Sequence, residues 1–99
     1  MAKNNKNAYP FEEAAEVMRS VAHPVRLAII SLLENKGSMN VRQIQDELGL
    51  KQSITSQHLS RMFGKGVLGK DKISNEVYYF IKKKEILKLM TCIRKCCNG

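Results

Sequence analysis

The stretch Leu48-Gly-Leu-Lys-Gln-Ser-Ile-Thr-Ser-Gln-His-Leu-Ser-Arg-Met-Phe63 decides how this chain folds. Leu48 completes the apolar face of one helix, and Gly49 can take the left-handed conformation that ends a helix. A second helix begins near Gln52, with small polar side chains at its start and apolar anchors behind them. The stretch therefore predicts two helices joined by a tight turn, with polar residues at the front of the second.

Three helices are expected before this turn. The first has one apolar face at helical spacing, made of Phe11, Ala14, Ala15, Met18, Val21 and Ala22, with Pro10 in its first turn. The second begins at Pro24, ends near Gly37 and is apolar almost all round, so it should be central and buried. Asn40 is a good N-cap for the third, over residues 41–48.

The helix after the turn should run over residues 52–65, with Leu59 and Met62 facing the core and Phe63 beside them. Residues 67–73 and 76–81 then predict a β-hairpin, because apolar residues of the second run alternate with a period of two. Residues 82–97 return to helical spacing. This order predicts a mainly α (α+β) winged helix-turn-helix, with a β-hairpin wing and terminal helices suited to dimerisation.

The size of the chain, 99 residues, allows one domain over residues 9–99, and we expect residues 1–8 to form a disordered N-terminal arm. Its net charge is +8, from 17 Lys and Arg against 9 Asp and Glu, which favours a polyanion as partner. The alternative is that the basic surface only keeps the protein soluble. In combination with the helix-turn-helix pattern, the charge favours double-stranded DNA.

The distribution of apolar residues and cysteines indicates the compartment. No apolar run approaches the length of about 20 residues that spans a bilayer, and the polar N-terminus is no secretory signal, so no membrane is expected. Three cysteines within residues 92–97 make a poor disulfide framework. The sequence therefore predicts a cytoplasmic protein with reduced thiols.

Four pieces of the sequence form a recognisable pattern: Ser20-Val-Ala-His-Pro-Val-Arg-Leu-Ala-Ile-Ile-Ser-Leu-Leu-Glu34, Gly49-Leu50, Ser56 with His58-Leu59, and the strand Val77-Tyr78-Tyr79. With these pieces the chain resembles the ArsR/SmtB-type bacterial repressors. The resemblance covers roughly residues 15–95, and its specificity lies in the order and spacing of these pieces. It implies a homodimer whose first and last helices pack across the dimer axis, and which represses transcription until an inducer binds.

The apolar stripes of the first and last helices agree with a dimer, because a small core cannot bury both stripes. The alternative is that the two stripes pack on each other within one subunit. We favour the homodimer, and the sequence leaves the inducer unidentified.

The second helix of the motif carries the residues that we expect to contact DNA. Gln57 can bridge adenine N6 and N7, Ser53 and Ser56 can reach base edges or phosphate, and Ile54 can pack on a thymine methyl. The full set on this helix is Lys51, Gln52, Ser53, Ile54, Ser56, Gln57, His58 and Arg61. Polar residues on a surface helix can also be merely solvated.

Single positions in this set carry alternatives. Lys51 stands where the family often has a capping Ser, so a cap is lost and a positive charge is gained. His58 either contacts phosphate or is a satisfied, half-buried histidine, and His23 is a helix-entry residue rather than a ligand. Lys70, Lys72 and Asn75 are expected at a wing tip that straddles the sugar–phosphate backbone.

The metal ligand sets of related sensors are missing at the matching positions. One type has Cys-Val-Cys where this chain has Asn40-Val41-Arg42, and another has histidines on a last helix that here carries none. No metal site and no cofactor is therefore expected. Cys92, Cys96 and Cys97 are candidate thiol sensors, because Cys92 and Cys96 share a helical face and Arg94 and Lys95 favour thiolate. The alternative, which we favour, is inert cysteines.

No enzyme is expected, since the chain has two histidines, no Gly-rich phosphate loop and no paired-carboxylate cleft. The rival reading is a winged helix that binds an acidic protein without specific DNA binding. Ser, Gln and His on the second helix favour DNA. The sequence thus predicts a homodimeric, sequence-specific regulator, a repressor acting on a near-palindromic operator and released by an inducer if one exists.

Overall fold

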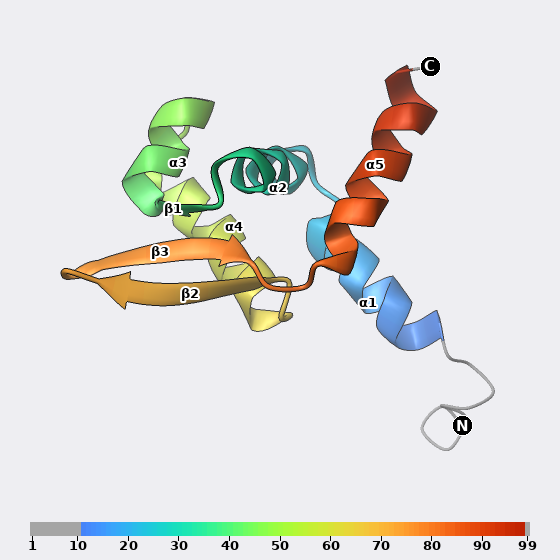
Figure 1. Cartoon of the computed structure of the whole chain (residues 1–99), viewed down its shortest axis with the longest axis horizontal. Helices are drawn as coiled ribbons and strands as arrows, with labels where there is room; N and C mark the ends of the chain where they lie inside the picture. Colours follow the sequence, from blue (N-terminus) through green and yellow to red (C-terminus); the bar gives the residue numbers. More distant parts are fainter. Residues whose placement is uncertain (1–10, 99) are drawn as a thin grey trace.

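The computed structural model describes residues 11–98, and the expected N-terminal arm and Pro10 lie outside this range. Its elements are α1 (Phe11–Val21), α2 (Pro24–Lys36), β1 (Ser38–Asn40), α3 (Val41–Leu48), α4 (Gln52–Gly64), β2 (Leu68–Ile73), β3 (Glu76–Ile81) and α5 (Glu85–Asn98). The hairpin of β2 and β3 reaches one end of the molecule, and α1 and α5 lie at the other (Figure 1). The predicted winged helix-turn-helix is confirmed.

The hydrophobic core is centred on α2, as its all-round apolar sequence predicts. Ile29 and Ile30 are fully buried, and Leu33 follows one turn later. These side chains pack with apolar residues from every other element, among them Met39, Ile44, Leu59, Met62, Leu68, Tyr79, Ile81, Ile86 and Met90. One core therefore holds the helices and the hairpin in a fixed relation.

Polar caps fix where α2 and α3 begin. The Val25 N–H donates to the His23 imidazole at 3.0 Å, which confirms His23 as a helix-entry residue. Asn40 accepts from the Gln43 N–H at 2.8 Å, and the Gln43 side chain accepts from the Asn40 N–H at 3.0 Å. This reciprocal capping box satisfies two donors that an α-helix otherwise leaves unpaired.

The sheet has the strand order β1-β3-β2 and is antiparallel throughout. The sequence did not indicate β1, because it has only three residues and forms by pairing with the distant β3, where Met39 stands opposite Tyr79. Gly69 stands opposite Phe80, whose ring would lie 2.5 Å from a Cβ at that position. Any side chain at position 69 would therefore displace this ring.

The last helix begins at Glu85, so its predicted start at residue 82 is wrong. The Lys82 and Lys83 N–H groups donate to the Val67 carbonyl at 2.9 and 3.1 Å. The chain is thus still tied to the base of the hairpin and cannot yet turn into a helix. No helix within residues 11–98 is long and apolar enough to cross a membrane.

Candidate DNA interface

A tight turn joins α3 to α4, as the Leu48–Gly49 sequence predicts. Gly49 has φ 66° and ψ 39°, and both its N–H and that of Leu50 donate to the Gln45 carbonyl. A residue with a Cβ would be strained at this positive φ. The turn sets the direction in which α4 leaves α3.

The two sides of α4 differ in burial and polarity. Thr55, Leu59 and Met62 have no exposed surface and pack into the core. Ser53 and Gln57 lie on the opposite, exposed side of the first turns, and Gln52 is exposed at the start of the helix. The core therefore holds one side of the helix while it presents short polar side chains on the other, which is what reading a major groove requires.

The remaining predicted residues of α4 fall into two groups. Ile54 is 41% exposed, and Lys51 and Arg61 are also exposed. Ser56 and His58 are half-buried. All eight predicted positions therefore have at least part of their side chain on the surface, and six are exposed outright.

The start of α4 lacks a side-chain cap, as the Lys at position 51 predicts. Lys51 has φ −78° and ψ 151° and makes no capping hydrogen bond through its side chain. Thr55 donates to the Lys51 carbonyl through both its N–H, at 3.0 Å, and its hydroxyl, at 2.9 Å. The unpaired N–H groups of this first turn and the Lys51 charge favour an anion there.

His58 is held by a contact that the sequence did not indicate. Arg26 Nε donates to His58 Nδ1 at 3.0 Å, and the His23 and His58 ring centroids lie 4.5 Å apart. Burial lowers the pKa of His58 below its usual value, and the electrostatic influence of His23, Arg26 and Arg61 lowers it further. His58 therefore accepts a hydrogen bond as neutral imidazole, which fits the half-buried alternative.

The tip of the wing is a two-residue turn. Ser74 has φ 51° and Asn75 has φ 70°. Positive φ at both central residues defines the turn type whose twist matches a tight hairpin. The predicted Asn75 turn is confirmed, whereas positive φ at Ser74 was not foreseen, because serine rarely adopts it.

The two predicted wing lysines lie at different places. Lys72 is exposed opposite Val77, close to the tip. Lys70 stands opposite Tyr79 in mid-hairpin, so its predicted place at the tip is wrong. Its ammonium lies 4.3 Å from the centroid of the Phe63 ring, a cation–π contact that joins wing and α4.

Phe63 also departs from prediction, because it is 40% exposed instead of packed in the core. The Lys70 side chain covers its ring. A further contact ties the wing to the other helix of the motif: Asn40 Nδ2 donates to Glu76 Oε1 at 2.6 Å. The wing is thus joined to the helix-turn-helix at two points, by a cation–π contact and by a side-chain hydrogen bond.

The last helix, α5, carries the candidate sensor cysteines. Cys92, Cys96 and Cys97 are all exposed. Arg94 Nη2 lies 2.7 Å from Glu34 Oε1 of α2, so its charge is engaged by a carboxylate. Within residues 11–98, no three His, Cys, Asp or Glu side chains gather closely enough to hold a metal ion.

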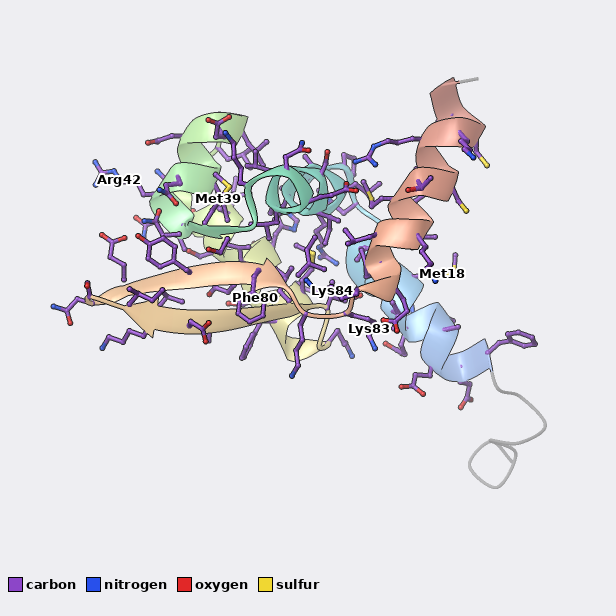
Figure 2. The ribbon with its side chains drawn as sticks, in the orientation of Figure 1. Met18, Met39, Arg42, Phe80, Lys83 and Lys84 are labelled. Carbon is purple, nitrogen blue, oxygen red and sulfur yellow. The ribbon has the colours of Figure 1, made fainter. Side chains whose placement is uncertain are left out.

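Lysines 82–84 follow β3 at the base of the hairpin, at the opposite end from its turn. Figure 2 shows Lys83 and Lys84 between the sheet and the terminal helices. These charges are therefore remote from the tip and can contribute only long-range attraction to a polyanion.

A turn-linked pair of helices, a polar face on the second and a lysine-bearing hairpin beside it define a winged helix-turn-helix DNA-binding protein. Residues 23–69 match the model of the bacterial regulatory proteins of the arsR family. The transcriptional repressor PagR of Bacillus anthracis is 42% identical over 86 residues, covering 84% of this chain and 86% of PagR. The chain belongs to the arsR family of transcriptional regulators and is a DNA-binding regulator; the reading as a protein-interaction module only is set aside.

Solved structures agree with this assignment. The crystal structure of PagR has a TM-score of 0.79 at 36% identity, covering 87% of this chain and 98% of PagR. NolR from Sinorhizobium fredii has a TM-score of 0.82 at 25% identity, covering 100% of this chain and 95% of NolR. The homodimeric winged helix-turn-helix domain of Mb0332 from Mycobacterium bovis has the same fold, with a TM-score of 0.82 at 22% identity over 99% and 91%.

Proposed function

We propose that the protein is a homodimeric repressor that places two α4 helices in successive major grooves of a near-palindromic operator. The observation that carries the proposal is the two-sided α4, with Thr55, Leu59 and Met62 fully buried, Ser53 and Gln57 exposed opposite them, and Gln52 exposed at the start of the helix. In this proposal Gln57 reads a base, and Ser53, Ser56 and Ile54 contact base edges or phosphate. Lys51, Arg61, Lys70, Lys72 and Asn75 contact the backbone.

The dimer is supported by the shape of the chain and by its exposed apolar side chains. The radius of gyration is 14.8 Å, above the value of about 13 Å for a compact domain of this length. Phe11 is 75% and Met18 is 55% exposed, both on α1. Among the relatives, Mb0332 is a homodimer. A second copy that covers α1 and α5 would bury these side chains.

Repression is supported by PagR, which is a transcriptional repressor. A dimer that occupies successive major grooves competes with other proteins for the same DNA. Since its target is chromosomal DNA, the protein would act in the cytoplasm. The inducer, if there is one, would change the angle between the two α4 helices.

A footprint on the DNA upstream of the protein's own gene tests this geometry. We expect two protected major-groove segments whose centres lie one helical turn, about 10 base pairs, or a whole multiple of it apart. Binding should fall steeply with salt. A single protected segment would contradict the dimeric arrangement, and protection that is equal on scrambled DNA would contradict sequence-specific recognition.

The cysteines are tested in the same assay with diamide or a soft metal ion. Loss of operator binding after one treatment, restored by Cys92→Ser, would assign the sensor to the α5 thiols. All three thiols are exposed and accessible to both reagents. Because Arg94 is engaged by Glu34 and the cysteines lie on α5 and not on α4 or the wing, we expect binding to be indifferent to both treatments.

A further inference from the structure

A cavity of about 380 Å³ opens between α1, the start of α2 and the second half of α4. Its lining is rich in cations: Arg19 from α1, Arg26 from α2, and Arg61 and Lys65 from the end of α4. One carboxylate, Glu16, and two serines, Ser20 and Ser60, complete its polar lining. The volume lies in the lower range of small-molecule pockets, which begins at about 300 Å³.

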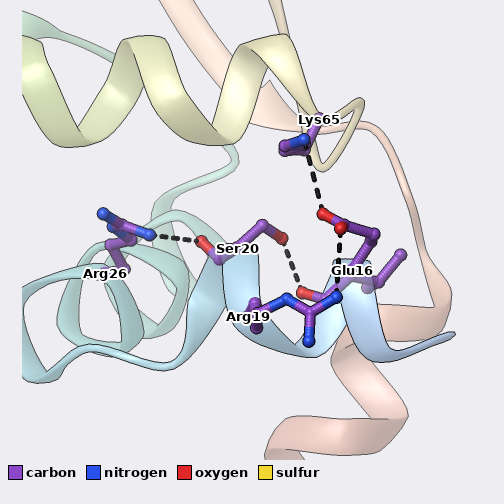
Figure 3. A network of polar contacts seen from close by, with 6 residues as sticks. Glu16, Arg19, Ser20, Arg26 and Lys65 are labelled. Atoms are coloured by element: carbon purple, nitrogen blue, oxygen red, sulfur yellow. Dashed lines mark hydrogen bonds and ion pairs between the residues drawn. The ribbon is translucent and has the colours of Figure 1, made fainter. Parts of the chain in front are cut away.

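The charges in this cavity are only partly balanced. Glu16 binds both Arg19, at 3.0 Å, and Lys65, at 3.4 Å (Figure 3). Hydrogen bonds from Arg19 and Lys65 lower the pKa of the Glu16 carboxyl, and burial opposes this shift only slightly. Within residues 11–98, Arg26 and Arg61 have no carboxylate partner. Four cations against one anion leave the lining with an excess of positive charge.

Arg26 is held in a fixed position at the inner end of this cavity. It is half-buried, donates to His58 Nδ1 at 3.0 Å and donates to the Ser20 carbonyl at 3.2 Å. A guanidinium has five N–H donors in a planar fork, so donors remain after these two bonds. Such a fork matches the geometry of a phosphate or carboxylate group.

We propose that this cavity binds a small molecule carrying a phosphoryl or carboxylate group, which Arg26 and Arg61 hold and Ser60 assists. Arg61 belongs to the second half of α4 and Lys65 directly follows the helix, whereas Gln52, Ser53 and Gln57 lie in its first turns. The anion site is therefore separate from the base-reading residues, although it shares Arg61 with the backbone contacts proposed above, and of the two arginines only Arg26 belongs to the anion site alone.

An anion in this cavity would act on α4 through Arg26. This guanidinium links the end of α1, through the Ser20 carbonyl, to His58 of α4. An oxyanion that draws the guanidinium toward itself weakens the bond to His58 and changes the position of α4 relative to α1. This regulatory step rests on the proposed function, in which α1 belongs to the dimer and α4 contacts DNA, whereas the binding site itself does not.

Binding is tested first without DNA, by titrating inorganic pyrophosphate into the isotopically labelled full-length protein at constant ionic strength. We expect saturable shifts of the Ser60 and Gly64 amide resonances. Arg26→Gln should weaken binding by about tenfold, since it removes a charge-assisted hydrogen bond. Arg61→Gln should weaken it similarly and keeps the fold, because Arg61 is exposed. Arg42→Gln, an exposed arginine of α3 outside the cavity, should bind as the unmodified protein does.

The absence of saturable shifts, or equal affinity of Arg61→Gln and Arg42→Gln, would overturn the proposal. The same titration on the complex with operator DNA then distinguishes a free small anion from the phosphate groups of the DNA backbone as the ligand of the cavity. Shifts of Ser60 and Gly64 that persist with DNA bound, with a change in DNA affinity, support a free small anion. Strict competition between pyrophosphate and DNA would assign the cavity to the DNA backbone and overturn it. If the protein bound pyrophosphate but not the operator, the proposed function would fail and the anion site would stand.

Discussion

The helices α4 and α5 are similar in length and both amphipathic, but the apolar side is fully buried within the chain only in α4. On α4, Thr55, Leu59 and Met62 are fully buried and the opposite side is polar. On α5, Ile86 and Met90 are buried, but Leu87, Leu89 and Ile93 remain half-exposed. The polar exposed side of α4 suits a polar ligand such as DNA. The partly exposed apolar side of α5 suits a second protein chain. One chain thus presents two surfaces for two different partners.

The largest effect should follow from opening the core beneath α4. Leu59→Ala removes a side chain with no exposed surface, which should cost about 2–5 kcal/mol of unfolding free energy. Ile54→Ala, on the exposed side of the same helix, should cost less than about 1 kcal/mol. Chemical denaturation of both variants measures this difference. Equal losses would mean that α4 is not anchored by one side.

A charge on α1 tests the apolar surface of the terminal helices. Met18→Glu should convert the dimer to a monomer near 11.2 kDa in sedimentation equilibrium, because a carboxylate would be buried between two chains. Ile73→Glu is the matched control, since Ile73 on the wing is 55% exposed, as Met18 is. A dimer that survives Met18→Glu, or that Ile73→Glu alone disrupts, would contradict the assignment of this surface.

A wing lysine should affect all DNA alike. Lys72→Ala should weaken binding to operator and scrambled duplex by a similar factor and reduce the salt slope by about one. Lys95→Ala, an exposed lysine at the end of α5, should leave both quantities unchanged. Fluorescence titrations at several salt concentrations measure the slope. If Lys72→Ala changed operator preference instead, the wing would read bases.

The smallest effect should be the pH dependence that His58 contributes. Burial and the nearby cations lower its pKa in the folded state, so the unfolded state binds its proton more readily. Stability should be complete above the unfolded pKa of about 6.5 and decrease as the pH falls through the folded value. His58→Asn does not titrate and should lose less stability than the unmodified protein between about pH 8 and about pH 5.5. An unchanged loss would assign the dependence to other groups.

The sequence predicted what depends on local patterns. Helix spacing, the Asn40 cap and Gly49 located α2, α3 and α4, and the period of two located the hairpin. Contacts between distant residues were missed: β1 with β3, Arg26 with His58, and Arg94 with Glu34. Each depends on two segments meeting in space, which a single sequence without related sequences does not reveal.

The same limit explains the errors at the site. Lys70 and Phe63 were assigned separately, one to the wing tip and the other to the core, although each is placed by its contact with the other. Gln52, Ser53 and Gln57 are exposed, as their assignment to the polar start of the helix predicts. Their contacts with DNA remain predictions.

The most direct test of the account is the operator preference of Gln57→Ala. The ratio of affinities for the protein's own upstream DNA and for a scrambled duplex is measured at one salt concentration, with Lys72→Ala as control. We expect Gln57→Ala to lose about 1–3 kcal/mol of discrimination, because a bidentate contact to adenine is removed, while Lys72→Ala keeps the ratio. An unchanged ratio in Gln57→Ala, or no preference in the unmodified protein, would contradict base reading by the exposed side of α4.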